Sequence, residues 1–254
     1  MLGTYLHKYI KNSIPVSCHK VEAMIIQRKA FKKQLDILDI KRSDVIINAI
    51  GIINKRKREP TEFMTVNSIF PRLLADYCEE LGANLIHVST DCVFDGSKGD
   101  YDECDIADDM SVYGMTKSAG EPTNCTVIRA SIIGENRNNS QDLLEWLRTH
   151  KNTEITGWVD HLWNGITCLQ FAKICDWLII GQHFWNGVRH FYSPTPISKA
   201  DLVEMISDIY GLNNSVIKIN APVACNRTLS TVYINSFKLP ELRDQIIEQK
   251  NFTI

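Results

Sequence analysis

The sequence lacks a strong excess of either charge. Its 28 lysines and arginines face 30 aspartates and glutamates, which gives a formal net charge of -2. Nucleic acids and anionic lipid surfaces attract proteins largely through a positive field, and this chain has none overall. We therefore expect no nucleic-acid partner and no membrane partner, and we look for binding in local sites.

Long hydrophobic runs and targeting signals are also missing. The longest apolar stretch, residues 45–53, is far shorter than the roughly 20 residues that a bilayer span requires. Residues 1–7 show no basic segment followed by an apolar run, so no secretion signal is predicted. These absences predict a cytoplasmic protein whose eight cysteines stay reduced.

The cysteines and histidines show no metal-ligand spacing. None of the eight cysteines forms a C-x-x-C pair, and the seven histidines follow no ligand-like pattern. We predict no metal site, and we expect most cysteines to be ordinary buried side chains.

A glycine-rich turn is the absence with the largest consequence. Dinucleotide-binding folds usually begin with a strand and a glycine-rich turn, whose backbone approaches the pyrophosphate at a helix N-terminus. Here a helix is predicted at once over residues 2–10, and only Gly3 could belong to such a turn. This pattern predicts a chain shortened by about one strand and turn, with cofactor binding that is weak or absent unless a longer form restores the turn.

The remaining pattern predicts an α/β protein. At 254 residues and 44% apolar, the chain can bury one core and a small lobe. Strand-length apolar runs alternate with segments of helical period, as in βα units around a parallel sheet. The predicted strands are 45–50, 84–89 and 126–133, and the predicted helices are 2–10, 67–81, 112–121, 140–149, 169–180 and 198–210. We expect a Rossmann-like doubly wound core over residues 1–134 and a substrate-binding lobe over 135–254, with segments that return to the core.

Tyr113 and Lys117 are a candidate catalytic pair. A spacing of four places both on one face of a helix, and a nearby cation lowers the pKa of a tyrosine from its usual value near ~10. Such a pair alone is common on protein surfaces. Residues 87–96, however, form an apolar strand that ends in hydroxyl residues and a turn. Ligand sites in α/β sheets form at the carboxyl ends of strands.

Several blocks in order carry a family resemblance. They are Ser89–Gly96, Lys98–Glu103, Tyr113–Lys117, Gly120–Glu121 and Val127–Gly134, with weaker similarity elsewhere that includes Trp163–Thr167. In these blocks the sequence resembles the dTDP-4-dehydrorhamnose reductases, a family of extended short-chain dehydrogenases. The resemblance implies NADPH- or NADH-dependent reduction of the C4 ketone of a nucleotide-linked 4-keto-6-deoxyhexose, in nucleotide-sugar and glycan biosynthesis. It also suggests a homodimer.

The resemblance assigns three catalytic roles. Thr90 matches the residue that hydrogen-bonds the substrate carbonyl, and Tyr113 matches the proton donor. Lys117 matches the lysine that tunes the tyrosine and holds the nicotinamide ribose, so Tyr113 and Lys117 also contact the cofactor. Hydride transfer to C4 builds negative charge on the ketone oxygen, which Thr90 and Tyr113 stabilise and protonate.

Further cofactor contacts are implied along the first half of the chain. Asp36 matches the acidic residue after the third strand, which contacts adenine, and Asn67 matches a helix asparagine. A plain loop acid and a strand-end cap are the alternative interpretations of Asp36 and Asn48. Residues 18–20 contain no acid or arginine that would distinguish NADH from NADPH. The complete set of predicted cofactor residues is Gly3, Asp36, Asn48, Ala49, Ile50, Gly51, Asn67, Ser89, Tyr113 and Lys117.

The predicted substrate contacts are Thr90, Asp91, Cys92 and Trp163. Trp163 could form an apolar wall of the site or pack in the core. Cys92 stands where the family usually has a tyrosine, and related epimerase-reductases place an acid–base cysteine two residues after the catalytic hydroxyl. A 3-epimerase/4-reductase is therefore an alternative, although the second acid–base position corresponds to Gln141, which cannot titrate. An inert, buried Cys92 is the simpler interpretation.

A non-catalytic role is the third alternative. The similar β subunit of methionine adenosyltransferase is a regulatory subunit, and the missing glycine turn is consistent with such a role. The presence of both Tyr113 and Lys117 argues weakly against it.

Overall fold

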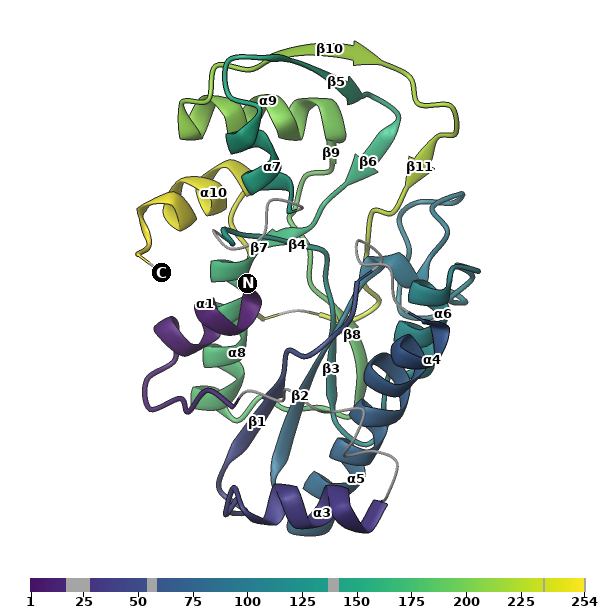
Figure 1. The fold of residues 1–254 in the computed structure, drawn as a ribbon, viewed down its shortest axis with the longest axis vertical. Coiled ribbons are helices and arrows are strands. Elements are labelled where there is room, and N and C mark those ends of the chain that lie inside the picture. Colours follow the sequence, from purple (N-terminus) through teal and green to yellow (C-terminus); the bar gives the residue numbers. More distant parts are fainter. Residues whose placement is uncertain (17–27, 54–58, 137–141, 235, 254) are drawn as a thin grey trace.

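A four-stranded parallel sheet forms the centre of the molecule (Figure 1). The computed structural model describes residues 1–16, 28–53, 59–136, 142–234 and 236–253. The strands lie in the order β1 (Val45–Asn48), β2 (Asn84–Ser89), β3 (Thr126–Arg129) and β8 (Gly187–His190). All three pairings are parallel, so the carboxyl ends of the strands share one edge.

Helices α1 (Leu2–Tyr9) and α8 (Cys168–Gly181) cover one face of the sheet (Figure 1). Ile86 and Ile128 point into this layer, where the ring of Phe171 is completely buried. Side chains alternate between the two faces along a strand, so Leu85 and Val127 point to the opposite layer. The sheet thus has an apolar core on each face.

The second face is covered by α3 (Arg28–Asp36), α5 (Phe70–Leu81) and α6 (Val112–Ala119). Helix α5 continues a longer helical segment that consists of α4 (Pro60–Phe63) and a π-helical stretch, Met64–Ile69. The arrangement of parallel strands between two helical layers confirms the predicted Rossmann-like α/β class.

A smaller lobe lies beyond the carboxyl ends of the strands (Figure 1). Its core contains the buried side chains of Leu147, Leu202, Ile206 and Ile246. The lobe contains α7 (Leu143–Thr149), α9 (Lys199–Tyr210), α10 (Leu242–Asn251) and the strands β5 (Glu154–Trp158), β6 (His161–Trp163), β9 (Ile197–Ser198), β10 (Ser215–Ile219) and β11 (Cys225–Asn226). Strand β10 pairs with β5, and β6 lies between β11 and β9.

The strand predicted over residues 126–133 is divided in two. Its first part is β3, whereas β4 (Ile132–Ile133) leaves the sheet and pairs with β7 (Ile166–Thr167). The backbone N–H of Ile166 also donates to the Ser131 carbonyl at 2.8 Å, which holds the chain at the bend. β8 and α8 belong to the central layers although both follow residue 134, and the division of the chain at that residue remains a prediction.

The predicted helices are all present, with shifted ends. Helix α9 has the predicted caps, because the Ser198 hydroxyl accepts from the Asp201 N–H at 3.0 Å and Gly211 adopts a φ of +64°. The predicted start of α7 at residue 140 lies outside the described residues. None of the helices in the described ranges has both the length and the apolar character of a bilayer span.

Candidate active site

The turn after β2 organises the catalytic hydroxyl. Thr90 caps a short 3-10 helix (Asp91–Val93), and its Oγ1 accepts from the Cys92 N–H at 3.2 Å. The same hydroxyl donates to Oδ1 of Asp91 at 3.1 Å, and the Cys92 thiol donates to that oxygen at 3.5 Å. One buried carboxylate therefore orients both Thr90 and Cys92 at the carboxyl end of the strand.

Tyr113 lies in the first turn of α6, opposite this turn. Ser111 caps the helix by accepting from the Gly114 N–H at 3.0 Å. The Thr90 hydroxyl is close enough to the Tyr113 phenol to lower its pKa. The structure thus brings together two of the three predicted catalytic residues.

The pKa of Tyr113 is shifted in the direction opposite to the one predicted from its spacing to Lys117. Burial raises it well above the usual value, the acidic groups of Cys92 and Asp91 raise it further, and the Thr90 hydroxyl lowers it in part. Lys117 is not among the groups that shift it. The phenol is therefore held in its protonated form, which is the form a proton donor needs.

Lys117 is buried against the sheet. Its Nζ donates to the Val88 carbonyl of β2 at 2.7 Å. Burial lowers the pKa of Lys117 to about 8, although the nearby charge of Glu121 raises it. The ammonium thus occupies a polar point at the strand end, one turn along α6 from Tyr113.

Asn67 ties α6 to the segment that follows β1. Its side-chain amide accepts from the Ile52 N–H at 2.9 Å and donates to the Ile52 carbonyl at 3.0 Å, and Nδ2 lies 3.4 Å from Oγ1 of Thr116. Gly120 packs against the backbone at this point, since a Cβ built there would lie 1.7 Å from the Asn67 carbonyl oxygen. The predicted cofactor residue Asn67 therefore has a structural role in the position of α6.

Asn48 and His87 form a buried polar pair beside Lys117. Oδ1 of Asn48 accepts from the Ile50 N–H at 3.1 Å, so its Nδ2 faces Nδ1 of His87, also at 3.1 Å. Burial, and then the charge of Lys117, hold the pKa of His87 well below its usual value. Nε2 of His87 has no partner in the described residues. A buried polar atom without a partner beside a lysine fits a site for a polar ligand such as the nicotinamide end of a cofactor.

Ser89 belongs to a buried network below the site. Its hydroxyl donates to Oε1 of Glu121 at 2.6 Å, and Glu121 forms a two-pronged ion pair with Arg129, both contacts 2.7 Å. The Arg129 guanidinium also lies over the Phe94 ring at 5.2 Å. The side chain of Ser89 is thus engaged by the protein, and its contact with a cofactor remains a prediction.

Two other predicted cofactor residues lie in helices. Asp36 ends α3, is exposed, and accepts from the Tyr77 hydroxyl at 3.0 Å. The rest of helix α3 directly precedes it, and its contact with the adenine of a cofactor remains a prediction. Gly3 lies in the first turn of α1, where a Cβ would meet no atom within 4 Å.

The segment directly after β1 contains three further predicted cofactor residues, Ala49, Ile50 and Gly51, and lies at the same sheet edge as Thr90. Their contacts with a cofactor remain predictions.

Cys92 is poorly suited to act as a base. Burial raises the pKa of its thiol to about 12, with Asp91 adding to the shift and Arg227 opposing it. The group is therefore a neutral thiol near pH 7, which weakens the epimerase alternative. Gln141 lies outside the described residues, as do residues 18–20.

The lobe contributes cations that the sequence did not single out. Nζ of Lys199 lies 5.3 Å above the Trp163 ring, and its charge interacts with Asp91, Cys92, Cys225 and Arg227. Trp163 itself is only 3% exposed and belongs to the lobe core, so Lys199 covers the ring. A direct contact between Trp163 and a substrate remains a prediction.

Arg227 links the lobe to the turn and to α6. Its Nε donates to the Phe94 carbonyl at 2.7 Å, and its Nη2 lies 3.1 Å from Oδ2 of Asp109. Asp109 in turn accepts from the N–H of Ser111, the cap of α6, at 2.8 Å. The catalytic turn, the tyrosine helix and the lobe thus share one set of polar contacts.

A family model described as the RmlD substrate binding domain matches residues 1–215. The chain belongs to the RmlD family. Among RmlD relatives, the dTDP-4-dehydrorhamnose reductase of Aggregatibacter actinomycetemcomitans is 32% identical over 187 residues, which are 68% of this chain and 63% of that protein. The dTDP-4-keto-6-deoxy-D-glucose reductase of Streptomyces niveus is 28% identical over 186 residues, 69% of this chain and 64% of that protein. The chain thus spans less than two thirds of these relatives.

Solved RmlD-type structures share the fold. A dTDP-4-dehydrorhamnose reductase from Clostridium acetobutylicum superposes with a TM-score of 0.79 at 21% identity, over 98% of this chain and 95% of that one. The enzyme from Bacillus anthracis, in complex with NADP, also gives 0.79, at 19% identity and the same coverages. The family resemblance inferred from the central motif blocks is therefore confirmed.

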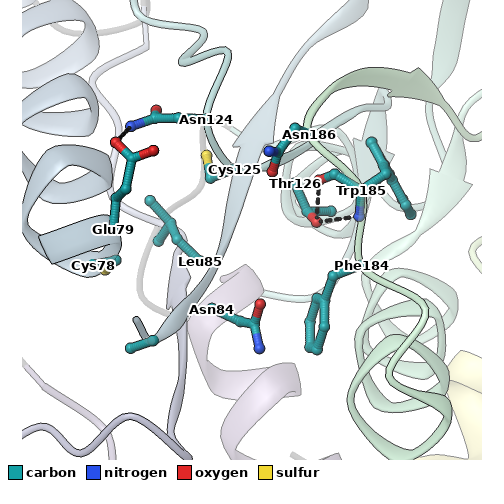
Figure 2. A pocket seen from close by; sticks show the side chains of 11 residues that line it. Cys78, Glu79, Asn84, Leu85, Asn124, Cys125, Thr126, Phe184, Trp185 and Asn186 are labelled. Carbon is teal, nitrogen blue, oxygen red and sulfur yellow. Dashed lines mark hydrogen bonds between the residues drawn. The ribbon is translucent and has the colours of Figure 1, made fainter. Parts of the chain in front are cut away.

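A hollow at the opposite, amino-terminal edge of the sheet is distinct from this RmlD-type site (Figure 2). It has a volume of about 270 Å³ and is open to solvent. Several of its polar groups already bind each other, as Asn124 Nδ2 donates to Oε2 of Glu79 at 2.7 Å and Thr126 Oγ1 donates to the Trp185 carbonyl at 2.8 Å. It therefore offers few free groups to a ligand.

Proposed function

We propose that this chain is an NAD(P)H-dependent reductase of the C4 ketone of a nucleotide-linked 4-keto-6-deoxyhexose. The observation that carries the proposal is the facing pair of protonated hydroxyls, Thr90 and Tyr113, at the carboxyl end of β2. It is supported by the reductases named among the relatives and by the structural neighbour that binds NADP.

The two hydroxyls suit the charge that develops on a reduced ketone. Tyr113 can donate to the ketone oxygen directly, and Thr90 can do so when its single proton turns from Asp91 to the substrate. Such donors act most strongly when negative charge builds on that oxygen. Because burial keeps the proton on Tyr113, the phenol can transfer it to the alkoxide. Asp91 accepts the Thr90 proton at 3.1 Å in this structure, so the hydroxyl must rotate away from this hydrogen bond before it can donate to the substrate.

The cofactor, when bound, supplies the hydride. Lys117 and the segment 48–51 would hold its nicotinamide end, and the buried pair of Asn48 and His87 would close the site from the sheet side. Asn67 would support this segment through its two hydrogen bonds to Ile52. Closure excludes water and strengthens the electrostatic effect of the donors.

Turnover of a ketosugar tests the proposal. The protein is incubated with NADPH or NADH and with dTDP- and UDP-linked 4-keto-6-deoxyhexoses, and cofactor oxidation and sugar product are measured. We expect turnover by the wild type and a loss of about 10²- to 10⁴-fold in Tyr113→Phe, because the general acid is removed. Tyr233→Phe, which changes an exposed tyrosine, is the matched control. Wild-type activity no higher than that of Tyr113→Phe would refute the proposal.

A homodimer and a cytoplasmic location are further parts of this proposal. Sedimentation of the purified protein at several concentrations would check the first, and fractionation of the cells that make it would check the second.

A further inference from the structure

His87 lies within β2, on the face of the sheet that α6 covers. Leu85, two residues earlier, points into the apolar core of that face, and side chains two apart along a strand point the same way. Lys117 reaches from α6 to the carbonyl of Val88, the residue after His87, at 2.7 Å. The ammonium and the imidazole are therefore neighbours, and the ring is completely buried.

Two hydrogen bonds decide which ring nitrogen of His87 carries the proton. The Ile50 N–H can only donate, so the Asn48 atom that faces it at 3.1 Å is the oxygen. The Asn48 amide nitrogen then faces Nδ1 of His87 at 3.1 Å and donates to it. Burial, and then the charge of Lys117, lower the pKa of His87, so the ring is neutral. Its single proton is therefore on Nε2.

His190, which is also completely buried, has the opposite tautomer. Its Nδ1 faces the carbonyls of Tyr101 and Ser230 at 3.2 and 2.9 Å, so Nδ1 carries the proton. Its Nε2 lies 3.3 Å from Nη1 of Arg129, a group that can only donate, and accepts there. A buried histidine beside a cation thus offers an acceptor at His190, whereas the bond from Asn48 prevents this at His87.

The Nε2–H group of His87 finds no acceptor among the described residues. It presents a donor to an ammonium that itself has three N–H groups, of which the described part of the chain engages one, at the Val88 carbonyl. An unpaired buried donor is unfavourable, and native proteins retain such groups mainly at functional sites. Lys117 therefore keeps N–H groups that the sheet does not satisfy.

We propose that His87 is a positioning residue which, held by Asn48 in its Nε2–H form, denies Lys117 an acceptor within the sheet and so turns its free N–H groups outward to the cofactor. This inference rests on the proposed function, because it concerns the same cofactor site. Glu121, the carboxylate whose charge acts on Lys117, does not replace the acceptor, since Arg129 engages both of its oxygens.

Nitrogen NMR of the isotope-labelled protein without any ligand tests the tautomer. We expect His87 to show a protonated Nε2 and an unprotonated Nδ1, and His190 to show the reverse. The loss of signals in His87→Phe assigns the resonances. A protonated Nδ1 of His87 at neutral pH, alone or together with a protonated Nε2, would overturn the inference.

The pKa of Lys117, followed by carbon NMR of labelled lysine, tests the missing acceptor. In His87→Gln the amide can turn its oxygen to the ammonium, so the pKa should rise by about one unit, the effect of one hydrogen bond to a charged group. His87→Phe has a ring of similar size without an acceptor and should keep the pKa at about 8. His7→Gln, which changes an exposed histidine, is the matched control.

Two results of this titration would contradict the role of His87. An unchanged pKa of Lys117 in His87→Gln would show that an acceptor at this position does not reach the ammonium. A pKa that falls in His87→Phe would show that the wild-type ring holds an acceptor for Lys117, such as a water molecule. Thermal melting verifies that the variants are folded, and His87→Met replaces His87→Phe if that variant is not.

Cofactor binding provides the last measurement. Fluorescence titrations with NADPH and NADH should give an affinity about 10-fold weaker in His87→Gln than in His87→Phe, because the glutamine draws an N–H group of Lys117 inward. Equal affinities, or a wild type that binds neither cofactor, would overturn the outward role of these groups. Binding by a wild type that reduces no ketosugar would refute only the proposed reaction.

Discussion

The two sides of the site are built in different ways. The sheet side consists of Thr90, Asp91, Cys92, Tyr113 and Lys117, which come from one short stretch of chain and are held by hydrogen bonds to each other and to β2. The lobe side consists of Trp163, Lys199 and Arg227, which are far apart in sequence and meet only after the lobe folds. The comparison teaches that neighbouring residues of one stretch of chain make the sheet side, whereas the lobe side is assembled by tertiary structure.

The largest expected effect is on the sheet side. Thr90→Val removes one of the two donors to the ketone oxygen and should reduce kcat by about 10²- to 10³-fold. The KM for the ketosugar should change less than kcat, since the hydroxyl acts on charge that develops during the reaction. Steady-state kinetics separates the two effects. Thr90→Ser keeps the hydroxyl and should restore most activity, and an equal loss in both variants would contradict the role of the hydroxyl.

The sheet side also depends on the buried pair of Glu121 and Arg129, whose side chains are 7% and 8% exposed. Arg129→Met leaves an uncompensated buried carboxylate and should lower the free energy of unfolding by about 3–5 kcal/mol. Urea denaturation measures the change. Replacing both residues by methionine should recover part of it, and a stability loss in the double variant equal to the sum of the single ones would argue against a coupled pair.

A smaller effect is expected from pH. Since the pKa of Lys117 is lowered to about 8, its ammonium loses its proton above that pH, and kcat/KM should fall about tenfold per pH unit there. Tyr113 adds no break in this range because burial raises its pKa. In Lys117→Arg, which stays charged, the decline should disappear even though the rate is lower. A decline that persists in this variant would assign the break to another group.

The smallest expected effect is that of Cys92→Ala. A thiol with a pKa near 12 provides almost no thiolate at neutral pH, so ketone reduction should continue with little change in kcat. Mass spectrometry of the product formed in deuterated water should show no deuterium at C3. Deuterium at C3 that Cys92→Ala removes would re-establish the epimerase alternative and make Cys92 a reacting group of the sheet side.

Local patterns in the sequence predicted much of the fold. The strand Asn84–Ser89 has the predicted ends, because its apolar residues are buried on both faces and Thr90 begins a capped turn. Helix α9 agrees closely with its prediction because a serine cap and a glycine stop mark its two ends. The parallel sheet follows from the alternation of such segments.

Features that depend on distant contacts could not be predicted in this way. Residues 126–133 form one apolar run, and only the pairing of β4 with β7 shows that the run is divided. Asp36 was assigned by resemblance to a strand end, but it lies at the end of an amphipathic helix with the buried residues Phe31 and Leu35. Lys199 and Arg227 follow no motif, and a lysine at the first position of a helix is common. Their meaning comes from the partners that the fold brings to them.

The contact between Gly120 and the Asn67 carbonyl has a consequence for genetic variation in this protein. Any side chain at position 120 would force α6 away from the π-helical stretch, and Tyr113 and Lys117 would move with it. Val66 and Phe70, on either side of Asn67, belong to the apolar core of the second face, so the same shift would also reach that core. A missense allele at this codon would therefore lower both the abundance of the protein and any activity that depends on α6, and screens for the two properties would score it alike.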